Sequence, residues 1–135
     1  MNDILTALRA VASAFVPGIE ETVIKAGRRI VMSDEEKKKL LSLINRRERQ
    51  LLVHSYIYYE LDDNIISDET WSKWAFELVE LREKHSDIFM LSEYASYFLT
   101  FDGSTGYDLM SGYTRPEIVN KALYLLRIEN KRAQH

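Results

Sequence analysis

Apolar residues recur at helical spacing along most of the chain. Between residues 3 and 16 an apolar position returns every three or four residues, at Ile4, Leu8, Val11 and Phe15. This spacing places apolar side chains on one face of a helix, and the Pro17-Gly18 pair is expected to end it. A second short helix is expected over residues 19–26, before Gly27. Residues 28–32 fit strand and coil equally well.

The strongest helix signal begins at Ser33. Ser33 followed by Glu36 is a capping box, in which the serine hydroxyl accepts a hydrogen bond from a backbone N–H of the first turn. An apolar row carries this helix to about Glu60, and its members are Leu40, Leu41, Ile44, Leu51, Leu52, Ser55, Tyr58 and Tyr59. The polar run Arg46–Arg49 interrupts the row. We interpret this run as exposed to solvent, with a phosphate-facing stretch as the alternative.

A second helix is predicted to pack back on the first. Asp62, Asp63 and Asn64 are turn formers, and Ser67 or Asp68 then caps the next helix. Its core-facing row is Trp71, Trp74 or Ala75, Leu78, and Leu81 or Arg82. Cations near residues 84–86 suit the C-terminal end of a helix. The two helices therefore make a hairpin.

The rest of the chain adds shorter elements. We expect an aromatic helix over residues 88–99, a glycine-containing loop over residues 101–108, and a last helix with Pro116 in its first turn. The fold class is all-α, a small single-domain helical bundle of about five to six helices around the central hairpin. Within the single domain 1–135, residues 1–50 form an N-terminal extension and the long helix start, residues 50–89 the hairpin, and residues 90–135 the loop and last helix.

Composition favours a soluble, cytoplasmic protein. At 135 residues the chain is one domain, and it has no cysteine, which excludes disulfides and thiolate catalysis. The acidic Asp3 and the basic Arg9 within the first apolar run argue against a secretory signal. No apolar run approaches the ~20 residues that a membrane-spanning helix needs. We therefore expect no membrane association.

Charge is divided unevenly along the sequence. Residues 25–49 hold nine basic against four acidic side chains, and residues 50–114 hold three basic against twelve acidic. The basic residues that could face nucleic acid or a partner are Lys37, Lys38, Lys39, Arg46, Arg47 and Arg49. Such a division suits docking on phosphates or on an oppositely charged protein, and it is also typical of solvated helix faces.

The hairpin corner collects aromatic and acidic side chains. The candidate ligand-binding residues are Tyr58, Tyr59, Asp68 and Trp71. Aromatic faces beside a carboxylate suit a flat ligand that carries a positive charge or an amide. The same residues are equally consistent with a well-packed helical hairpin. His54, His85 and His135 are too far apart in sequence to suggest a metal site, and we identify no catalytic residues.

The order of motifs over residues 50–89 is specific. A tyrosine-rich helix end, Tyr56-Ile57-Tyr58-Tyr59, is followed by Ser67-Asp68, by Trp71, and by His85 after the second helix. This order resembles the small N-terminal helical domain, domain Ia, of NAD-dependent DNA ligases. Short phage-encoded DNA ligase-like proteins that lack the adenylation domain share the hairpin and a following FDGSTG-type segment, which here is residues 101–106.

The resemblance implies a nicotinamide-nucleotide site, because in the ligases this domain grips the nicotinamide mononucleotide half of NAD. Tyr58 matches the ligase tyrosine, and Asp68 matches the first aspartate of the ligase motif. Tyr59 stands where histidine is frequent, and Trp71 replaces a second tyrosine. Ser72 replaces a further aspartate, and the loss of such a buried polar contact costs about 1–3 kcal/mol.

Ligase chemistry itself is excluded by the sequence. The lysyl-adenylate of these enzymes needs a lysine in a Lys-x-Asp-Gly context. The one Asp-Gly pair here is Asp102-Gly103, and the residue two positions before it is Thr100. We therefore predict a protein that is not an enzyme and has no resident cofactor.

Three functions follow from these features. Our leading expectation is a non-catalytic, phage-encoded interaction module that binds and modulates a host or phage protein, such as a bacterial defence or nucleic-acid-processing factor. Residues 1–50 would supply the surface for that partner or for a homo-oligomer. The first alternative is binding of NAD or nicotinamide mononucleotide, and the second is nucleic-acid binding through the basic face of the long helix.

Overall fold

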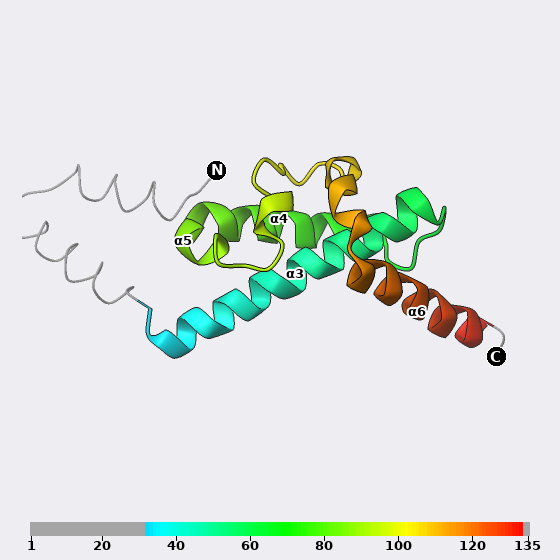
Figure 1. The fold of residues 1–135 in the computed structure, drawn as a ribbon, viewed down its shortest axis with the longest axis horizontal. Coiled ribbons are helices and arrows are strands. Elements are labelled where there is room, and N and C mark those ends of the chain that lie inside the picture. Colours follow the sequence, from blue (N-terminus) through cyan, green and yellow to red (C-terminus); the bar gives the residue numbers. More distant parts are fainter. Residues whose placement is uncertain (1–31, 134–135) are drawn as a thin grey trace, which may run out of the picture.

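The computed structural model describes residues 32–133, and this part of the chain consists of helices joined by turns and loops, with no strand. Its elements are α3 (Asp34–Glu60), α4 (Asp68–Lys84), α5 (Ser86–Phe89), the 3-10 helices η1 (Ala95–Tyr97) and η2 (Tyr107–Thr114), and α6 (Pro116–Ala133) (Figure 1). The all-α prediction is confirmed for these residues, which hold four α-helices. The helices expected at 3–16 and 19–26, and nearly all of the ambiguous segment 28–32, lie outside the described residues.

The long helix α3 begins and ends where the sequence predicts. The Ser33 Oγ accepts a hydrogen bond of 3.2 Å from the backbone N–H of Glu36, which satisfies one of the free donors of the first turn. The helix ends at Glu60, and Asp62 then takes a positive φ of 51°. Aspartate tolerates this left-handed conformation better than most residues, so the chain reverses here.

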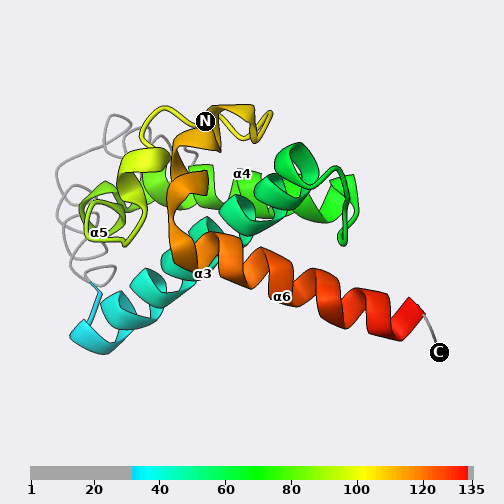
Figure 2. The same ribbon diagram turned by 45° about the vertical axis from the view of Figure 1, so that its right-hand side comes forward.

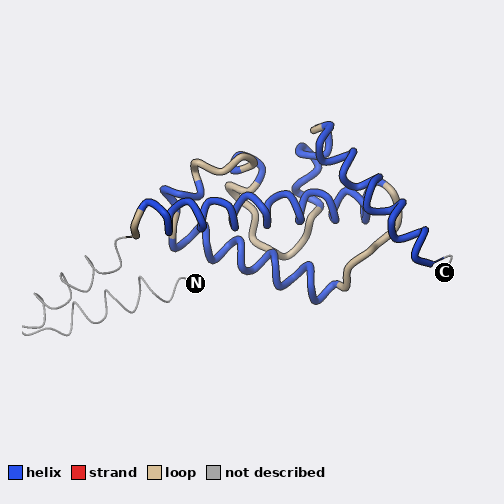
Figure 3. The backbone as a smooth tube through the Cα atoms, turned by 90° about the horizontal axis from the view of Figure 1, so that it is seen from below, coloured by secondary structure: helices blue, strands red, loops and turns tan. Residues whose placement is uncertain are grey.

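Helix α4 runs back along α3 and completes the predicted hairpin (Figure 3). Ser67 is its N-cap, and the Ser67 Oγ accepts a hydrogen bond of 3.1 Å from the Thr70 N–H. Within the predicted core-facing row, Ala75 and Leu78 are buried, while Trp71 and Trp74 are partly buried against the core. The hairpin is therefore the scaffold that the remaining segments cover.

The core-facing side of α3 differs from the prediction at its C-terminal end. Tyr58 and Tyr59 were expected in the apolar row but are 54% and 38% exposed. Their side chains lie at the surface of the hairpin corner and not in the core. The buried positions near this end are Val53, Ser55 and Ile57, so the last turns of α3 direct their tyrosines toward a surface site.

The interpretation of Arg46–Arg49 as an exposed run is wrong for two of its members. Glu48 is fully buried and accepts hydrogen bonds from the Ser92 hydroxyl at 2.7 Å and from the Tyr94 backbone N–H at 3.1 Å. Burial raises the pKa of Glu48 to about 7. Arg47 is also largely covered, in an ion pair with the Glu77 carboxylate at 3.2 Å.

The single helix expected over residues 88–99 is replaced by α5, a turn and η1. Side chains of α3 take the backbone donors that would have continued it: the Glu93 N–H donates to the Asn45 side chain, and the Tyr94 N–H donates to Glu48. The Ser92 hydroxyl also bonds to the Phe89 carbonyl at 2.6 Å. Such side-chain bonds compete with the helical ladder, so the segment folds as short turns over α3.

Helix α6 crosses α3 and extends its C-terminal half beyond the other helices (Figure 2). Ile118 and Ala122 are buried where the two helices meet. Farther along, Leu123 and Tyr124 are exposed. No helix among the described residues is both long and apolar enough to cross a membrane.

Candidate functional site

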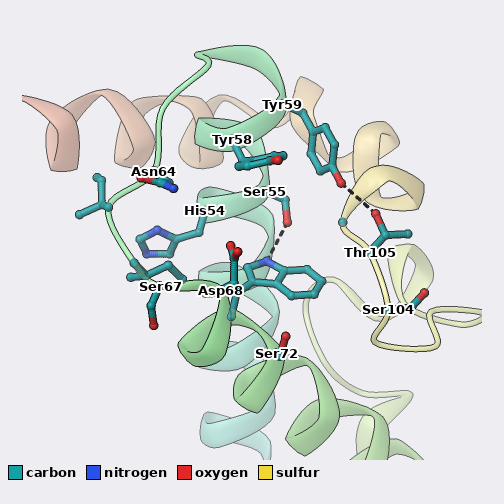
Figure 4. A pocket seen from close by; sticks show the side chains of 14 residues that line it. His54, Ser55, Tyr58, Tyr59, Asn64, Ser67, Asp68, Ser72, Ser104 and Thr105 are labelled. Atoms are coloured by element: carbon teal, nitrogen blue, oxygen red, sulfur yellow. Dashed lines mark hydrogen bonds between the residues drawn. The ribbon is translucent and has the colours of Figure 1, made fainter.

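A cavity of about 230 Å³ lies at the corner of the α3–α4 hairpin. Four segments wall it: the end of α3, the turn after it, the start of α4, and the FDGSTG loop at residues 101–106 (Figure 4). The four candidate ligand-binding residues Tyr58, Tyr59, Asp68 and Trp71 all line this cavity. The structure thus brings together side chains that were selected from sequence, whereas their binding of a ligand stays a prediction.

Trp71 forms a fixed wall of the cavity. Its indole N–H donates a hydrogen bond of 3.1 Å to the hydroxyl of Ser55, which is buried in α3 (Figure 4). Its ring also meets the edge of Phe101 with 6.1 Å between centroids. Because both contacts hold the indole in place, Trp71 presents a preorganised aromatic surface to the cavity.

The two tyrosines form the opposite side. Tyr58 and Tyr59 meet edge to face with ring centroids 4.9 Å apart. The Tyr59 hydroxyl lies 2.8 Å from the Thr105 hydroxyl, so it is bonded to the FDGSTG loop (Figure 4). Tyr58 has no such tie and is the more exposed of the pair. Tyr58 is therefore the aromatic side chain that is free to adjust to a ligand.

The FDGSTG loop is held against the hairpin by local chemistry. The Arg82 guanidinium of α4 donates to the carbonyl of Phe98, at 2.7 Å, and to that of Phe101, the first residue of the loop, at 2.6 Å. Within the loop, the Asp102 carboxylate accepts hydrogen bonds from the Ser104 hydroxyl and backbone N–H. These bonds hold the pKa of Asp102 below its ordinary value. Asp102 is thus the anchor of a turn.

Gly106 allows the loop to approach α3 closely. A Cβ atom added there would lie 2.3 Å from the Ser55 Oγ and 2.8 Å from the Ser55 Cβ, and real side chains do not approach so closely. The same serine accepts the hydrogen bond from Trp71. The absence of a side chain at residue 106 is therefore part of the cavity wall's construction.

Asp68 supplies the negative charge of the site. It stands in the first turn of α4, is exposed, and forms no hydrogen bond or ion pair with another described residue. Figure 4 shows its carboxylate pointing toward the space between His54 and Ser55. No lysine or arginine lines this cavity, so the carboxylate is available to a ligand.

His54 is a member of the site that sequence reasoning missed. It precedes Tyr58 by four residues and so shares its helix face, which is the signal that could have identified it. Its Nδ1 is buried and has no hydrogen-bond partner among the described residues. Burial lowers the pKa of His54, which favours the neutral imidazole.

The predicted basic residues do not form one surface. Lys37, Lys38 and Lys39 are exposed near the start of α3. Arg46 and Arg49 lie farther along and line a second cavity, on the side of α3 that faces α6. Arg47 is instead bonded to Glu77, with its guanidinium 5.6 Å from the centre of the Trp74 ring. At least one of the six cations therefore has a structural partner.

The polar groups of the hairpin-corner site indicate which kind of ligand would suit it. Among the described residues no group of three or more histidines, aspartates or glutamates could hold a metal ion. The Ser104 and Thr105 hydroxyls already bond to Asp102 and Tyr59. An aromatic wall, one free carboxylate and a neutral imidazole suit a flat ligand that is neutral or positively charged.

Comparison with known proteins agrees with part of this description. A stretch of 54 residues, 40% of this chain, is 35% identical to a DNA ligase of Thermosipho africanus (strain TCF52B). The stretch spans 8% of that ligase. No protein-family model matches the chain, and no solved structure matches it. The chain therefore contains a segment similar to a small part of a DNA ligase.

Proposed function

We propose that this protein is a non-catalytic binder of a nicotinamide nucleotide, with its site at the hairpin corner. The observation that carries the proposal is the convergence of Tyr58, Tyr59, Asp68 and Trp71 on one cavity. These residues were selected because the hairpin resembles domain Ia of NAD-dependent DNA ligases, and a segment of the chain is similar to a ligase.

The chemistry of the cavity matches the nicotinamide end of such a ligand. The oxidised nicotinamide ring is flat and positively charged, and it carries a carboxamide. The Trp71 ring, fixed by Ser55, offers a face for stacking, and cation–π attraction contributes about 0.5–2 kcal/mol. The free Asp68 carboxylate attracts the ring charge and accepts hydrogen bonds from an amide N–H or a ribose hydroxyl.

The size of the cavity limits what it encloses. Its volume of about 230 Å³ is below the ~300–1,000 Å³ of pockets that enclose drug-sized ligands. It suits the ring and ribose of one nucleotide, and the remainder of the ligand would lie outside it. This fits a protein that uses the nicotinamide half as the recognised group.

A fluorescence titration with nicotinamide mononucleotide tests the proposal. Trp71 should report stacking as a change in emission that saturates with ligand. Asp68→Asn should weaken binding by about tenfold or more, since a hydrogen bond to a charged group contributes about 1.5–3 kcal/mol. Glu69→Gln is the matched control, because Glu69 is the adjacent exposed acid of the same helix turn but does not line the cavity. Equal losses in both variants would refute a specific role for Asp68.

A second candidate function is the interaction module, and exposed apolar side chains favour it. Met90 and Leu91, just after α5, are 58% and 72% exposed, and Leu123 and Tyr124 are exposed on α6. Exposed apolar groups of this size mark protein contacts when they are contiguous. Leu91→Lys and Leu123→Lys would each be compared with wild type for the oligomeric state in solution. If the oligomeric state were unchanged in both variants, self-association through these side chains would be excluded.

The phage origin of the chain and nucleic-acid binding stay predictions. Nucleic-acid binding would rest on Lys37, Lys38, Lys39, Arg46 and Arg49, because the Arg47 guanidinium is paired with Glu77. Nucleic-acid binding would be recognised by an affinity that falls steeply with salt concentration. That affinity would be lost when the charges of Arg46 and Arg49 are reversed. A salt-independent interaction would exclude phosphate-backbone recognition.

A further inference from the structure

A second and larger cavity lies between α3 and α6. Its volume is about 550 Å³, within the range of enclosed ligand pockets. Val53 of α3 and Ile118 and Leu125 of α6 give it an apolar floor. The ligase-like residues selected from sequence do not line it. We call this cavity the α3–α6 groove.

Three cations line the groove, and none is committed elsewhere by an ion pair among the described residues. They are Arg46 and Arg49 of α3 and Lys121 of α6. Two acids also line it, but Glu117 is already bonded to the Arg115 guanidinium at 2.8 Å and to the Tyr94 hydroxyl at 3.0 Å. Glu93 alone opposes the three cations with a carboxylate that is not so engaged, so the groove attracts anions.

His54 lines both the groove and the hairpin-corner cavity, so the two cavities are neighbours along α3. At 1.5 Å of helix rise per residue, Arg49 lies only about 7.5 Å before His54 along α3, which is close to the length of an extended arginine side chain. The buried Nδ1 of His54 also lacks a partner. A ligand that extends from the hairpin-corner cavity past His54 would therefore come toward these cations.

The hairpin-corner cavity is itself a poor place for a phosphate. It has no lysine or arginine in its wall, and the exposed Asp68 carboxylate repels a second negative charge. The hydroxyls of Ser104 and Thr105 are held by Asp102 and Tyr59. The two cavities thus divide the charges of a nucleotide, with the negative wall facing a cationic ring and the positive groove facing an anion.

We propose that the α3–α6 groove is the phosphate subsite of the same ligand, with the nicotinamide riboside part at the hairpin corner and the phosphate beyond His54. This inference rests on the proposed function. The groove, rather than the start of α4, receives the phosphate because the first turn of α4 already carries Asp68 and Glu69.

The test compares nicotinamide riboside with nicotinamide mononucleotide, which differ by one phosphate, by calorimetric titration of the full chain. Wild type should bind the mononucleotide at least about tenfold tighter, since charge-assisted hydrogen bonds from arginine to phosphate are among the strong ones. In the double variant Arg46→Gln/Arg49→Gln this ratio should fall toward one, while the riboside affinity is unchanged. Both arginines are exposed, so the variant is expected to fold, and circular dichroism checks this.

The matched control is Lys131→Gln/Arg132→Gln, which removes the same charge from exposed positions of α6 outside the groove. This control should keep the wild-type ratio of mononucleotide to riboside affinity. If the control also lost that ratio, net charge alone would explain the effect, and the phosphate subsite would be overturned. If Arg46→Gln/Arg49→Gln kept the wild-type affinity ratio, the phosphate subsite would also be overturned. Riboside binding at the hairpin corner would be unaffected by that result. Failure of wild type to bind either compound would refute the proposed function as well.

Discussion

At the scale of single residues, Ser55 is the point where the site is assembled. It is buried in α3, accepts the hydrogen bond of the Trp71 indole, and lies against Gly106 of the FDGSTG loop. Three segments distant in sequence therefore meet at one hydroxyl. The sequence signalled Trp71 and the loop separately, but it gave no sign that a serine in an apolar row would join them.

Gly106→Ala should destabilise the protein by about 1–3 kcal/mol, the usual cost of overpacking, because the new Cβ would collide with Ser55. The measurement is chemical denaturation of wild type and variant. In a Ser55→Gly background the collision partner is gone, so the cost of Gly106→Ala should shrink. The same cost in both backgrounds would show that the contact with Ser55 is not its cause.

Glu48 should make stability depend on pH. Its pKa is about 7 in the folded protein against 4.5 as its ordinary value, so the folded state binds more protons between these values. Stability from this group is therefore full below about pH 4.5 and is lost as pH rises through about 7, by an amount on the order of 3 kcal/mol.

Glu48→Gln should flatten this pH dependence, because a glutamine is neutral throughout and can still accept from the Tyr94 N–H. Denaturation midpoints between pH 4.5 and 8 provide the measurement. Exposed Glu69→Gln serves as the comparison, since Glu69 is not among the groups that shift the pKa of Glu48. If stability still fell with rising pH in Glu48→Gln, the pH dependence would belong to other groups.

At the scale of elements, the hairpin was predictable because its signals are local. Ser33 and Ser67 act as N-caps, and the apolar spacing between them sets the length of α3. The segment over residues 88–99 was not predictable, because Asn45 and Glu48 capture its backbone donors from more than 40 residues away. Periodicity cannot show such a long-range competition, and it also assigned Tyr58 and Tyr59 to the core.

Arg82 links α4 to the loop at the site, and its replacement tests this link. Arg82→Met keeps the apolar stem but removes both bonds to the Phe98 and Phe101 carbonyls. The free energy of unfolding is expected to fall by at most about 1.5–3 kcal/mol for each charge-assisted bond. Amide hydrogen exchange over residues 98–106 should become faster. Unchanged exchange in that segment would mean that the guanidinium does not hold the loop.

At the scale of the whole molecule, the two cavities place opposite charge on either side of His54. The acidic excess of residues 50–114 and the basic excess of residues 25–49 were visible in the sequence as blocks. Folding brings Lys121 of α6 beside Arg46 and Arg49, a grouping that no spacing along the chain indicates. The hairpin-corner residues were indicated by motifs along the chain, whereas the groove depends on α6 crossing α3.

The most direct test of nicotinamide-nucleotide binding is a thermal-shift titration with nicotinamide mononucleotide on wild type and Asp68→Asn. A ligand that binds only the folded state raises stability by about 2.7 kcal/mol at 100 times its Kd. We predict a rise in the wild-type Tm that saturates with ligand and is strongly reduced in Asp68→Asn. No shift in wild type at millimolar ligand, or an equal shift in both proteins, would contradict a nicotinamide site at the hairpin corner.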